Sequence, residues 1–338
     1  MTDEVILQVK DLRTYFYTDA GVVKAVDGLT FDLHKGETLG LVGESGSGKS
    51  VTNLSVIKLI QTPPGKIEGG EVLFNGEDLL KMSDARLREI RGDRIAMIFQ
   101  DPMSSLNPYL RISTQMIETI CLHQGLNKKA AKEKAIEMLK LTGIPAAEKR
   151  IDGYPHQFSG GMRQRVMIAM GLSCNPDILI ADEPTSALDV TIQAQILDLM
   201  QDLTHRLGTA VILITHSLGV VAGVCDTIVV MYAGRIVERG TTEDIFYNTK
   251  HPYTQGLIKS VPRLDRDDEG RLFSIEGQPP NVVDLPDCCP FYPRCHKALP
   301  VCKNRYPPVV RFSGTHHAAC WLYAQKDGGT LTSEDTTK

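Results

Sequence analysis

The sequence predicts an α/β protein with a parallel sheet, an N-terminal antiparallel β portion, a helical insert and a small C-terminal extension. Three observations support this prediction. Strand-like and helical segments alternate over residues 177–231, which is typical of a parallel sheet covered by helices. Residues 112–172 have a helical pattern that interrupts the strands. Five of the eight cysteines lie beyond residue 287, where the composition has changed.

The N-terminal portion is rich in β-branched and aromatic residues, which favour strands. The strands expected there cover residues 5–17, 23–33, 38–42 and 71–74. Asn75-Gly76 follows the last of these strands, and this dipeptide favours a tight hairpin turn. The strand at 38–42 ends at a glycine-rich turn, after which residues 49–60 have a helical pattern.

The rest of the chain is expected to alternate between helices and strands. Residues 94–99 have the pattern of a buried strand, and residues 128–142 place apolar side chains at helical spacing before Gly143. Further strands are expected at residues 177–181, 210–215 and 227–231, with a helix at 191–203. Residues 263–270 form a charged linker, and residues 325–338 are polar and expected to be disordered. We therefore expect a main domain at residues 1–262 with its helical insert at about 110–172, an extension at 263–324 and a tail at 325–338.

The composition is that of an ordinary globular protein. Its 37 basic and 41 acidic side chains give a formal net charge of -4, so no excess of positive charge indicates a nucleic-acid partner. No stretch reaches the ~18 uninterrupted apolar residues of a membrane-spanning helix. The first residues lack the basic start and apolar core of a secretory signal. We therefore expect a cytosolic chain that binds no nucleic acid.

Residues 43–50 match the phosphate-binding pattern G-x-x-x-x-G-K-[ST], between an expected strand and an expected helix. The matching residues are Gly43, Glu44, Ser45, Gly46, Ser47, Gly48, Lys49 and Ser50. Glycines allow successive backbone N–H groups to face one concavity that holds phosphates, next to the positive end of a helix dipole. Lys49 would reach the terminal phosphates, and the Ser50 hydroxyl would coordinate Mg²⁺. The pattern therefore predicts a P-loop NTPase.

Two carboxylates follow the apolar strand at residues 177–181. Parallel sheets bind ligands at the C-terminal ends of their strands, which is where Asp182 and Glu183 lie. Neighbouring side chains of a strand point to opposite faces, so these two residues need different roles. We assign Asp182 to the magnesium shell and Glu183 to polarising the attacking water. The alternative is an acidic strand end that is merely solvated, which is less consistent with a phosphate loop in the same chain.

With these motifs in this order, about residues 5–260 resemble the ATP-binding cassette (ABC) family. The resemblance implies that ATP and Mg²⁺ are the ligands. It implies that Gln100 contacts Mg²⁺ and the water and provides a link to membrane subunits, and that His216 contacts the γ-phosphate. Near the N-terminus, Phe16 or its neighbour Tyr15 would stack on adenine.

Residues 158–162 resemble the signature motif of the ABC family, and residues 186–189 resemble its D-loop, which ends at Asp189. In the commonest form of the signature, LSGGQ, leucine and glutamine stand where this chain has phenylalanine and methionine. Ser159, Gly160 and Gly161 are retained. The resemblance implies that these three residues donate hydrogen bonds to the γ-phosphate of a nucleotide on a partner ATPase. It therefore implies a head-to-tail pair of cassettes.

Two further segments and the cysteine-bearing tail resemble the branch of the family that imports dipeptides, oligopeptides and nickel. Residues 101–108 follow the glutamine, where cassettes of the family meet membrane subunits, and residues 251–257 read HPYTQGL. The resemblance implies a peripheral ATPase on the cytoplasmic face of the inner (plasma) membrane that powers import of di- or oligopeptides. Its implied partners are a second, non-identical ATPase subunit, two transmembrane permease subunits and, indirectly, an extracytoplasmic peptide-binding protein. The alternatives are a soluble ATPase of the family without a permease, or an importer of another substrate such as nickel.

Four cysteines of the extension are candidate ligands of one metal centre: Cys289, Cys295, Cys302 and Cys320. The prolines between them favour turns, so the four thiolates could converge. Four thiolates suit a [4Fe–4S] cluster, and their spacing resembles that of the peptide importer ATPases. The absence of a tight C-x-x-C pair makes zinc the weaker alternative, and metal-free thiols are the third. Cys288 is left without an expected role.

Overall fold

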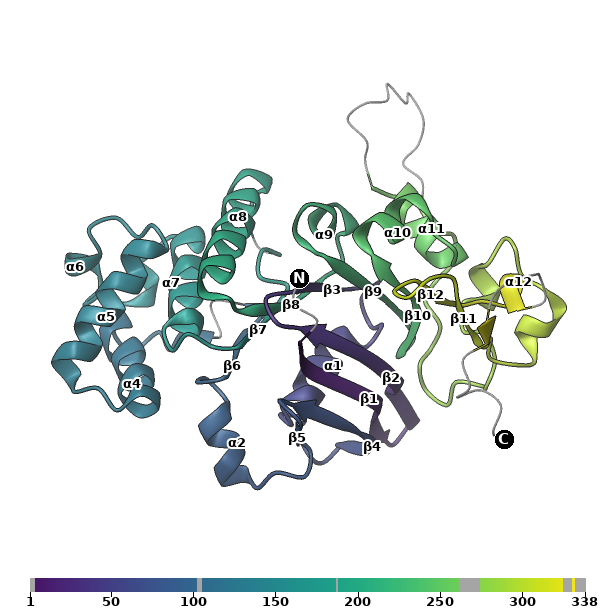
Figure 1. Cartoon of the computed structure of the whole chain (residues 1–338), viewed down its shortest axis with the longest axis horizontal. Helices are drawn as coiled ribbons and strands as arrows, with labels where there is room; N and C mark the ends of the chain where they lie inside the picture. Colours follow the sequence, from purple (N-terminus) through teal and green to yellow (C-terminus); the bar gives the residue numbers. More distant parts are fainter. Residues whose placement is uncertain (1–3, 102–104, 187, 262–273, 325–329, 332–338) are drawn as a thin grey trace. The chain divides into compact units, whose positions relative to one another are not determined.

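The computed structural model describes residues 4–101, 105–186, 188–261, 274–324 and 330–331 (Figure 1). The contacts between residues divide the chain into two compact units. The first unit consists of Met1–Ile6, Leu33–Thr38 and Lys81–Ile214, and the second of Leu7–Asp32, Leu39–Leu80 and Thr215–Lys338. The C-terminal extension therefore belongs to the same unit as the phosphate loop.

The first unit is built on three parallel strands. They are β6 (Ile95–Ile98), β7 (Ile178–Asp182) and β8 (Ala210–Thr215), with β7 in the middle. Ile98 pairs with Ala181, and Asp182 pairs with Ile214. β7 and β8 are buried along their whole length, which explains their almost continuous apolar sequence. The strands expected in these three places are confirmed to within one or two residues.

Helices make up most of the remaining first unit. They are α2 (Asp84–Ile90), α4 (Ile112–Gln124), α5 (Lys128–Leu141), α6 (Ala147–Arg150), α7 (Gly160–Leu172) and α8 (Val190–Leu207), with a 3₁₀ helix at Pro155–Gln157. α4, α5 and α7 pack against one another (Figure 1). The Asn127 side chain caps α5 by accepting hydrogen bonds from two N–H groups of its first turn. The apolar residues of α5 at helical spacing are buried as expected, and Gly143, with φ of 73°, follows its end.

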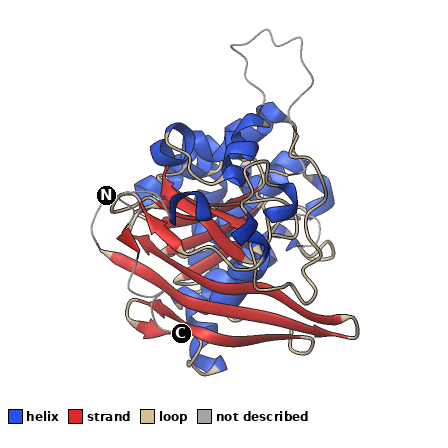
Figure 2. Cartoon of the chain, turned by 90° about the vertical axis from the view of Figure 1, so that its right-hand side faces the viewer, coloured by secondary structure: helices blue, strands red, loops and turns tan. Residues whose placement is uncertain are grey.

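The second unit contains an antiparallel sheet, and strands are drawn in red in Figure 2. Its strand order is β2-β1-β4-β5. Its strands are β1 (Val5–Thr18), β2 (Gly21–His34), β4 (Gly65–Phe74) and β5 (Glu77–Asp78). Asn75 and Gly76 have φ values of 49° and 83°, the left-handed conformations that a type I′ hairpin turn requires. The expected hairpin is therefore confirmed, although β4 begins at Gly65 rather than at residue 71.

The second unit also contains a mixed set of strands. β3 (Thr38–Val42) is parallel to β9 (Thr227–Tyr232), and β10 (Arg235–Thr241) is antiparallel to β9. The extension adds β12 (His317–Ala319) beside β10, followed by β11 (Val309–Arg311), and β13 (Thr330–Leu331) in the tail pairs with β11. The helices of this unit are α1 (Lys49–Val56), α9 (Leu218–Val224), α10 (Thr242–Tyr247), α11 (Pro252–Lys259) and α12 (Trp321–Ala324), with 3₁₀ helices at Tyr292–Arg294 and Pro300–Lys303. The extension thus continues a sheet that begins in the main domain.

Some expectations need correction. α1 ends at Val56 rather than at residue 60, and Lys58 just beyond it is left-handed, with φ of 53°. The tail expected to be disordered contains β13, whose main chain pairs with β11. The other residues of that tail and the charged linker at 263–270 lie outside the described residues. None of the described helices is long and apolar enough to cross a membrane.

Candidate functional site

The phosphate loop connects β3 to α1 and needs glycine at two positions. A Cβ atom at Gly43 would collide with the Met231 carbonyl oxygen. At Gly48 it would collide with the Ala25 carbonyl oxygen, and the φ of 102° at Gly48 is itself unfavourable for other residues. The loop is therefore packed closely against the neighbouring main chain. Of the eight residues predicted for it, the first six lie between β3 and α1, and Lys49 and Ser50 begin the helix.

The Lys49 side chain lies over this loop. Its Nζ atom donates hydrogen bonds to the carbonyl oxygens of Gly43 (2.7 Å) and Glu44 (2.9 Å), and only 6% of the residue is exposed. Ser50 is exposed in the first turn of the helix. A buried ammonium beside helix N–H groups provides positive charge where phosphates bind in such loops.

Two residues from the C-terminal part of the second unit contact the loop: Tyr253, in the segment 251–257, and Arg294, which the sequence did not single out. The Glu44 N–H donates to the Tyr253 hydroxyl (2.8 Å). The Glu44 carboxylate accepts hydrogen bonds from both terminal nitrogens of Arg294, at 2.6 and 3.0 Å. These pairs are 209 and 250 positions apart in the chain, so no local pattern could have indicated them.

In the first unit, Gln100 and Glu183 lie together. Gln100 Nε2 donates a hydrogen bond to Glu183 Oε2 at 2.9 Å. Asp182 is the last residue of β7 and is 6% exposed, and Glu183 directly follows that strand. The structure therefore places three predicted site residues near the C-terminal end of β7, where a carboxylate is oriented by a neighbouring amide.

The signature and D-loop residues lie at helix N-termini in the first unit. Ser159 caps α7 by accepting a hydrogen bond from the Met162 N–H (3.3 Å), and Gly160 begins that helix. Phe158 is buried, which is consistent with an apolar residue at the position of the leucine in LSGGQ. Asp189 caps α8 in the same way as Ser159 caps α7. The exposed N-terminus of α7 is suited to binding an anion, whereas the Asp189 carboxylate already occupies the N-terminus of α8.

The remaining predicted residues lie in the second unit. The Tyr15 hydroxyl donates to Asp27 Oδ1 (2.7 Å), and burial together with this hydrogen bond raises the pKa of Tyr15 to about 12. Phe16 is the next residue of β1 and therefore points to the opposite face of the strand. His216 is exposed directly after β8.

Comparison with known proteins identifies the family. Residues 26–186 match the family described as ABC transporter. The oligopeptide transport ATP-binding protein OppD of Bacillus subtilis is 52% identical over 317 residues, which are 94% of this chain and 88% of the relative. The dipeptide transport ATP-binding protein DppD of the same species is 50% identical over 332 residues, which are 98% of this chain and 99% of the relative. The chain belongs to the ABC transporter family.

A solved structure supports the cassette fold of this ABC ATPase. A dimeric ATP-binding cassette in a post-hydrolysis state with ADP and Pi has a TM-score of 0.63 and 26% identity, and the match covers 70% of this chain and 98% of that one. Residues 237–302 of the ABC ATPase also match the family described as oligopeptide/dipeptide transporter, C-terminal region. The predicted P-loop ATPase fold and the predicted peptide transporter branch are both confirmed.

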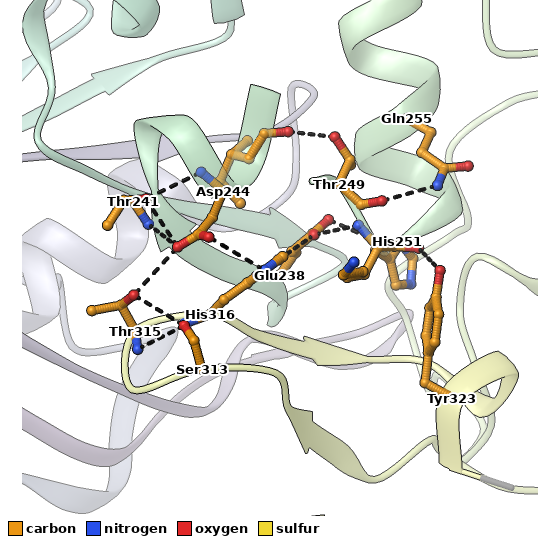
Figure 3. A network of polar contacts seen from close by, with 12 residues as sticks. Glu238, Thr241, Asp244, Thr249, His251, Gln255, Ser313, Thr315, His316 and Tyr323 are labelled. Atoms are coloured by element: carbon orange, nitrogen blue, oxygen red, sulfur yellow. Dashed lines mark hydrogen bonds and ion pairs between the residues drawn. The ribbon is translucent and has the colours of Figure 1, made fainter. Parts of the chain in front are cut away.

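A polar network attaches the extension of the ABC ATPase to β10, α10 and α11 (Figure 3). Glu238 in β10 is completely buried, and its Oε1 lies 2.9 Å from His316 Nε2 in the extension. The same carboxylate accepts hydrogen bonds from the N–H groups of Lys250 (2.6 Å) and His251 (3.0 Å). The Tyr323 hydroxyl donates to the Lys250 carbonyl oxygen (3.2 Å). His316 lies 78 positions from Glu238, so a sequence pattern could not reveal this contact between the extension and β10.

The four candidate ligand cysteines converge. Cys289, Cys295, Cys302 and Cys320 line one cavity, to which His251 also contributes. All four are free thiols, and burial raises the pKa of Cys289 to about 12 and that of Cys320 to about 11. The cavity has a volume of about 10 Å³, room for roughly one water molecule.

The arrangement of these side chains does not support the expected metal centre. Within the described ranges, no group of three or more His, Cys, Asp or Glu side chains has an arrangement that would hold one metal ion. Neither the expected [4Fe–4S] cluster nor the zinc alternative, and hence no metal-binding extension, gains support from the described residues. Cys288, which had no expected role, lines a different cavity of about 330 Å³ beside Arg235.

Proposed function

We propose that this ABC ATPase hydrolyses ATP to power the import of di- or oligopeptides across the cytoplasmic membrane. The observation that supports this most strongly is the identity of about half of its residues, over nearly the whole chain, to proteins named for oligopeptide and dipeptide transport. We propose residues 1–262 as the nucleotide-binding domain and residues 263–324 as the extension.

The phosphate loop is the proposed binding site for ATP and Mg²⁺. Loop N–H groups and Lys49 would bind the phosphates, and Ser50, Asp182 and Gln100 would hold Mg²⁺. The ion would neutralise charge that develops on the phosphate oxygens. The close packing of the loop and the burial of Lys49 support this assignment.

Hydrolysis is assigned to groups at the end of β7 and after β8. Glu183 would accept a proton from the attacking water, and the hydrogen bond from Gln100 would orient its carboxylate. His216 would contact the γ-phosphate. Phe16 is the proposed adenine-stacking residue, because the neighbouring Tyr15 is already hydrogen-bonded to Asp27 on the other face of β1.

The ABC ATPase is proposed to work as a head-to-tail pair with a second, non-identical ATPase subunit. Ser159, Gly160 and Gly161 would donate to the γ-phosphate bound by the partner, and Asp189 would contact the same interface. The exposed N-terminus of α7 supports this role. The dimeric state named for the matched cassette is consistent with such a pair.

The remaining proposed partners are two membrane permeases and, indirectly, an extracytoplasmic peptide-binding protein. The ABC ATPase would then be peripheral on the cytoplasmic face. Affinity purification of the full chain from detergent-solubilised membranes tests this proposal. Co-purification of two multi-span permeases supports it, whereas a purely soluble ATPase would bring none. Loading the binding protein with peptides or with nickel separates the two importer alternatives.

A [4Fe–4S] cluster is the proposed occupant of the cysteine cavity. The support is that four thiols line one cavity, which matches the four ligands of such a cluster. A cavity of about 10 Å³ would have to widen to admit it. The cluster would hold the extension together rather than transfer electrons. Anaerobic purification should yield stoichiometric iron and sulfide, and a colourless protein with zinc or with no metal would refute this assignment.

A further inference from the structure

Arg294 makes an unusually complete set of contacts for an arginine outside the nucleotide site. It ends the 3₁₀ helix Tyr292–Arg294, and its side chain is 5% exposed. Both terminal nitrogens donate to the Glu44 carboxylate of the phosphate loop, in the bidentate geometry that suits a guanidinium. Its other hydrogen bonds go to the Glu276 carbonyl oxygen (3.1 Å), the Ile275 carbonyl oxygen (3.3 Å) and the Tyr232 hydroxyl (3.3 Å).

These contacts account for all five N–H donors of the guanidinium. The guanidinium is therefore held on one side by main-chain carbonyl oxygens of the extension and on the other by the Glu44 carboxylate of the phosphate loop. A lysine in its place would have three donors and no planar fork, so it could not reproduce the arrangement.

The main chain of Glu44 is fixed from the same side. Its N–H donates to the hydroxyl of Tyr253, a fully buried residue of α11. The Tyr253 ring packs against Tyr232 and Phe291, with ring centroids 4.6 and 5.4 Å apart. One aromatic cluster thus supports both the tyrosine that holds the Glu44 main chain and the arginine that holds its carboxylate.

We propose that Arg294 is a positioning residue for ATP binding, acting through Glu44 to hold the phosphate loop in its binding conformation. This inference rests on the proposed function, because it requires the loop to bind ATP. A carboxylate in a phosphate-binding loop is unfavourable for an anionic ligand unless its charge is neutralised and directed away. Arg294 supplies both effects, so the C-terminal part of the chain contributes to a site formed by residues 43–50.

The test compares Mg-ATP binding by the full-length wild type, Arg294→Ala, Arg294→Lys, Glu44→Gln and the Arg294→Ala/Glu44→Gln double variant. Arg305→Gln, at an exposed position of the extension, is the matched control. We expect Arg294→Ala to weaken Mg-ATP binding roughly tenfold, as when a charge-assisted bidentate contact is removed. Arg294→Lys should fail to restore binding. In the Glu44→Gln background, Arg294→Ala should have much less effect, since the two residues act as a unit.

Two further readouts separate positioning from simple stabilisation. In the assembled transporter, the KM for ATP should rise in Arg294→Ala while kcat at saturating ATP stays near the wild-type value. Thermal unfolding shows whether each variant is folded. If Arg294→Ala does not fold, Mg-ATP binding by Glu44→Gln still tests the contact, because this substitution changes the other partner. Unchanged affinity in Arg294→Ala, or additive effects in the double variant, would overturn the inference. Failure of the wild type itself to bind ATP would instead refute the proposed function.

Discussion

Glu183 lies in a backbone conformation that most residue types avoid. Its φ of 46° is in the left-handed region, which costs a non-glycine residue about 1–3 kcal/mol. Its N–H donates to the Ile214 carbonyl oxygen (3.0 Å), and its own carbonyl oxygen accepts hydrogen bonds from Ser186. These hydrogen bonds fix the main chain of Glu183 at the end of β7, as its proposed role as general base requires.

Glu183→Gln should separate ATP binding from hydrolysis. The amide keeps the size of the side chain and a hydrogen-bonding partner for Gln100, but it cannot accept the proton of water. We expect hydrolysis in the assembled transporter to fall by roughly 10²- to 10⁴-fold, with Mg-ATP affinity retained. Rate assays and equilibrium binding measure both quantities. Glu148→Gln, an exposed change in α6, should alter neither, and normal turnover in Glu183→Gln would disprove the assignment.

His251 makes the stability of the second unit sensitive to acid. It is buried, and burial lowers its pKa to about 4. Above the unfolded-state pKa of about 6.5 the residue is neutral in both states, so it has no effect. As pH falls below 6.5, the unfolded chain binds a proton that the folded chain excludes. The free energy of unfolding should therefore decrease by up to about 3 kcal/mol between pH 6.5 and 4.

His251→Asn tests this pH dependence. The His251 ring caps α11 by accepting the Tyr253 N–H, and asparagine is also a good helix cap that does not titrate. Urea unfolding at pH 7 and pH 5 should show a smaller loss of stability in the variant. Some loss should remain, because the pKa of His317 is also lowered to about 4. An identical loss in both proteins would contradict the role of His251.

At the scale of elements, the strand–loop–helix unit from β3 to α1 depends on steric room. Gly46 and Gly48 both have positive φ values, but only Gly48 has a neighbouring atom where a Cβ would lie. Gly48→Ala should therefore destroy ATP binding and lower the free energy of unfolding by about 1–3 kcal/mol or more. Gly46→Ala should lower the free energy of unfolding only by the cost of placing alanine at a positive φ, because no atom lies where its Cβ would be. Binding and thermal unfolding of both variants provide the test, and equal effects would contradict it.

Elements with local signals were predictable from the sequence. The buried strand β8 and the turn at Asn75-Gly76 are where residue patterns place them. β10, β11 and β12 were missed, although β10 pairs with the preceding strand β9 and β11 with the following strand β12; only the pairing of β10 with β12 joins segments far apart in the chain. The helix predicted to residue 60 ends at Val56, since a left-handed residue soon afterwards is incompatible with its continuation.

The candidate site also contains residues with a local sequence signal and residues without one. The phosphate loop and the two carboxylates at the end of β7 belong to short motifs, so their residues could be named in advance. The contact between Glu44 and Arg294 spans 250 positions, and the Glu238–His316 pair spans 78. Such pairs arise only when the extension folds against the rest of the second unit. Tertiary packing, rather than any local propensity, determines them.

At the scale of the whole molecule, the extension is joined to the second unit by buried polar contacts as well as strand pairing. Few of its large apolar side chains are buried, Phe291 and Val310 among them. A segment with so small an apolar core gains little stability by itself. Its order therefore depends on the Glu238 network and on the pairing of β12 with β10.

The central claim is that ATP hydrolysed by this ABC ATPase drives peptide import. Uptake of a labelled di- or oligopeptide into proteoliposomes containing the assembled transporter and its binding protein tests the claim most directly. With wild-type chain, uptake should require ATP on the side of the ATPase subunits. With Lys49→Ala it should fall to the level without ATP, because the buried ammonium of the phosphate loop is lost. Undiminished ATP-dependent uptake with Lys49→Ala, or no ATP-dependent uptake with the wild type, would contradict the claim.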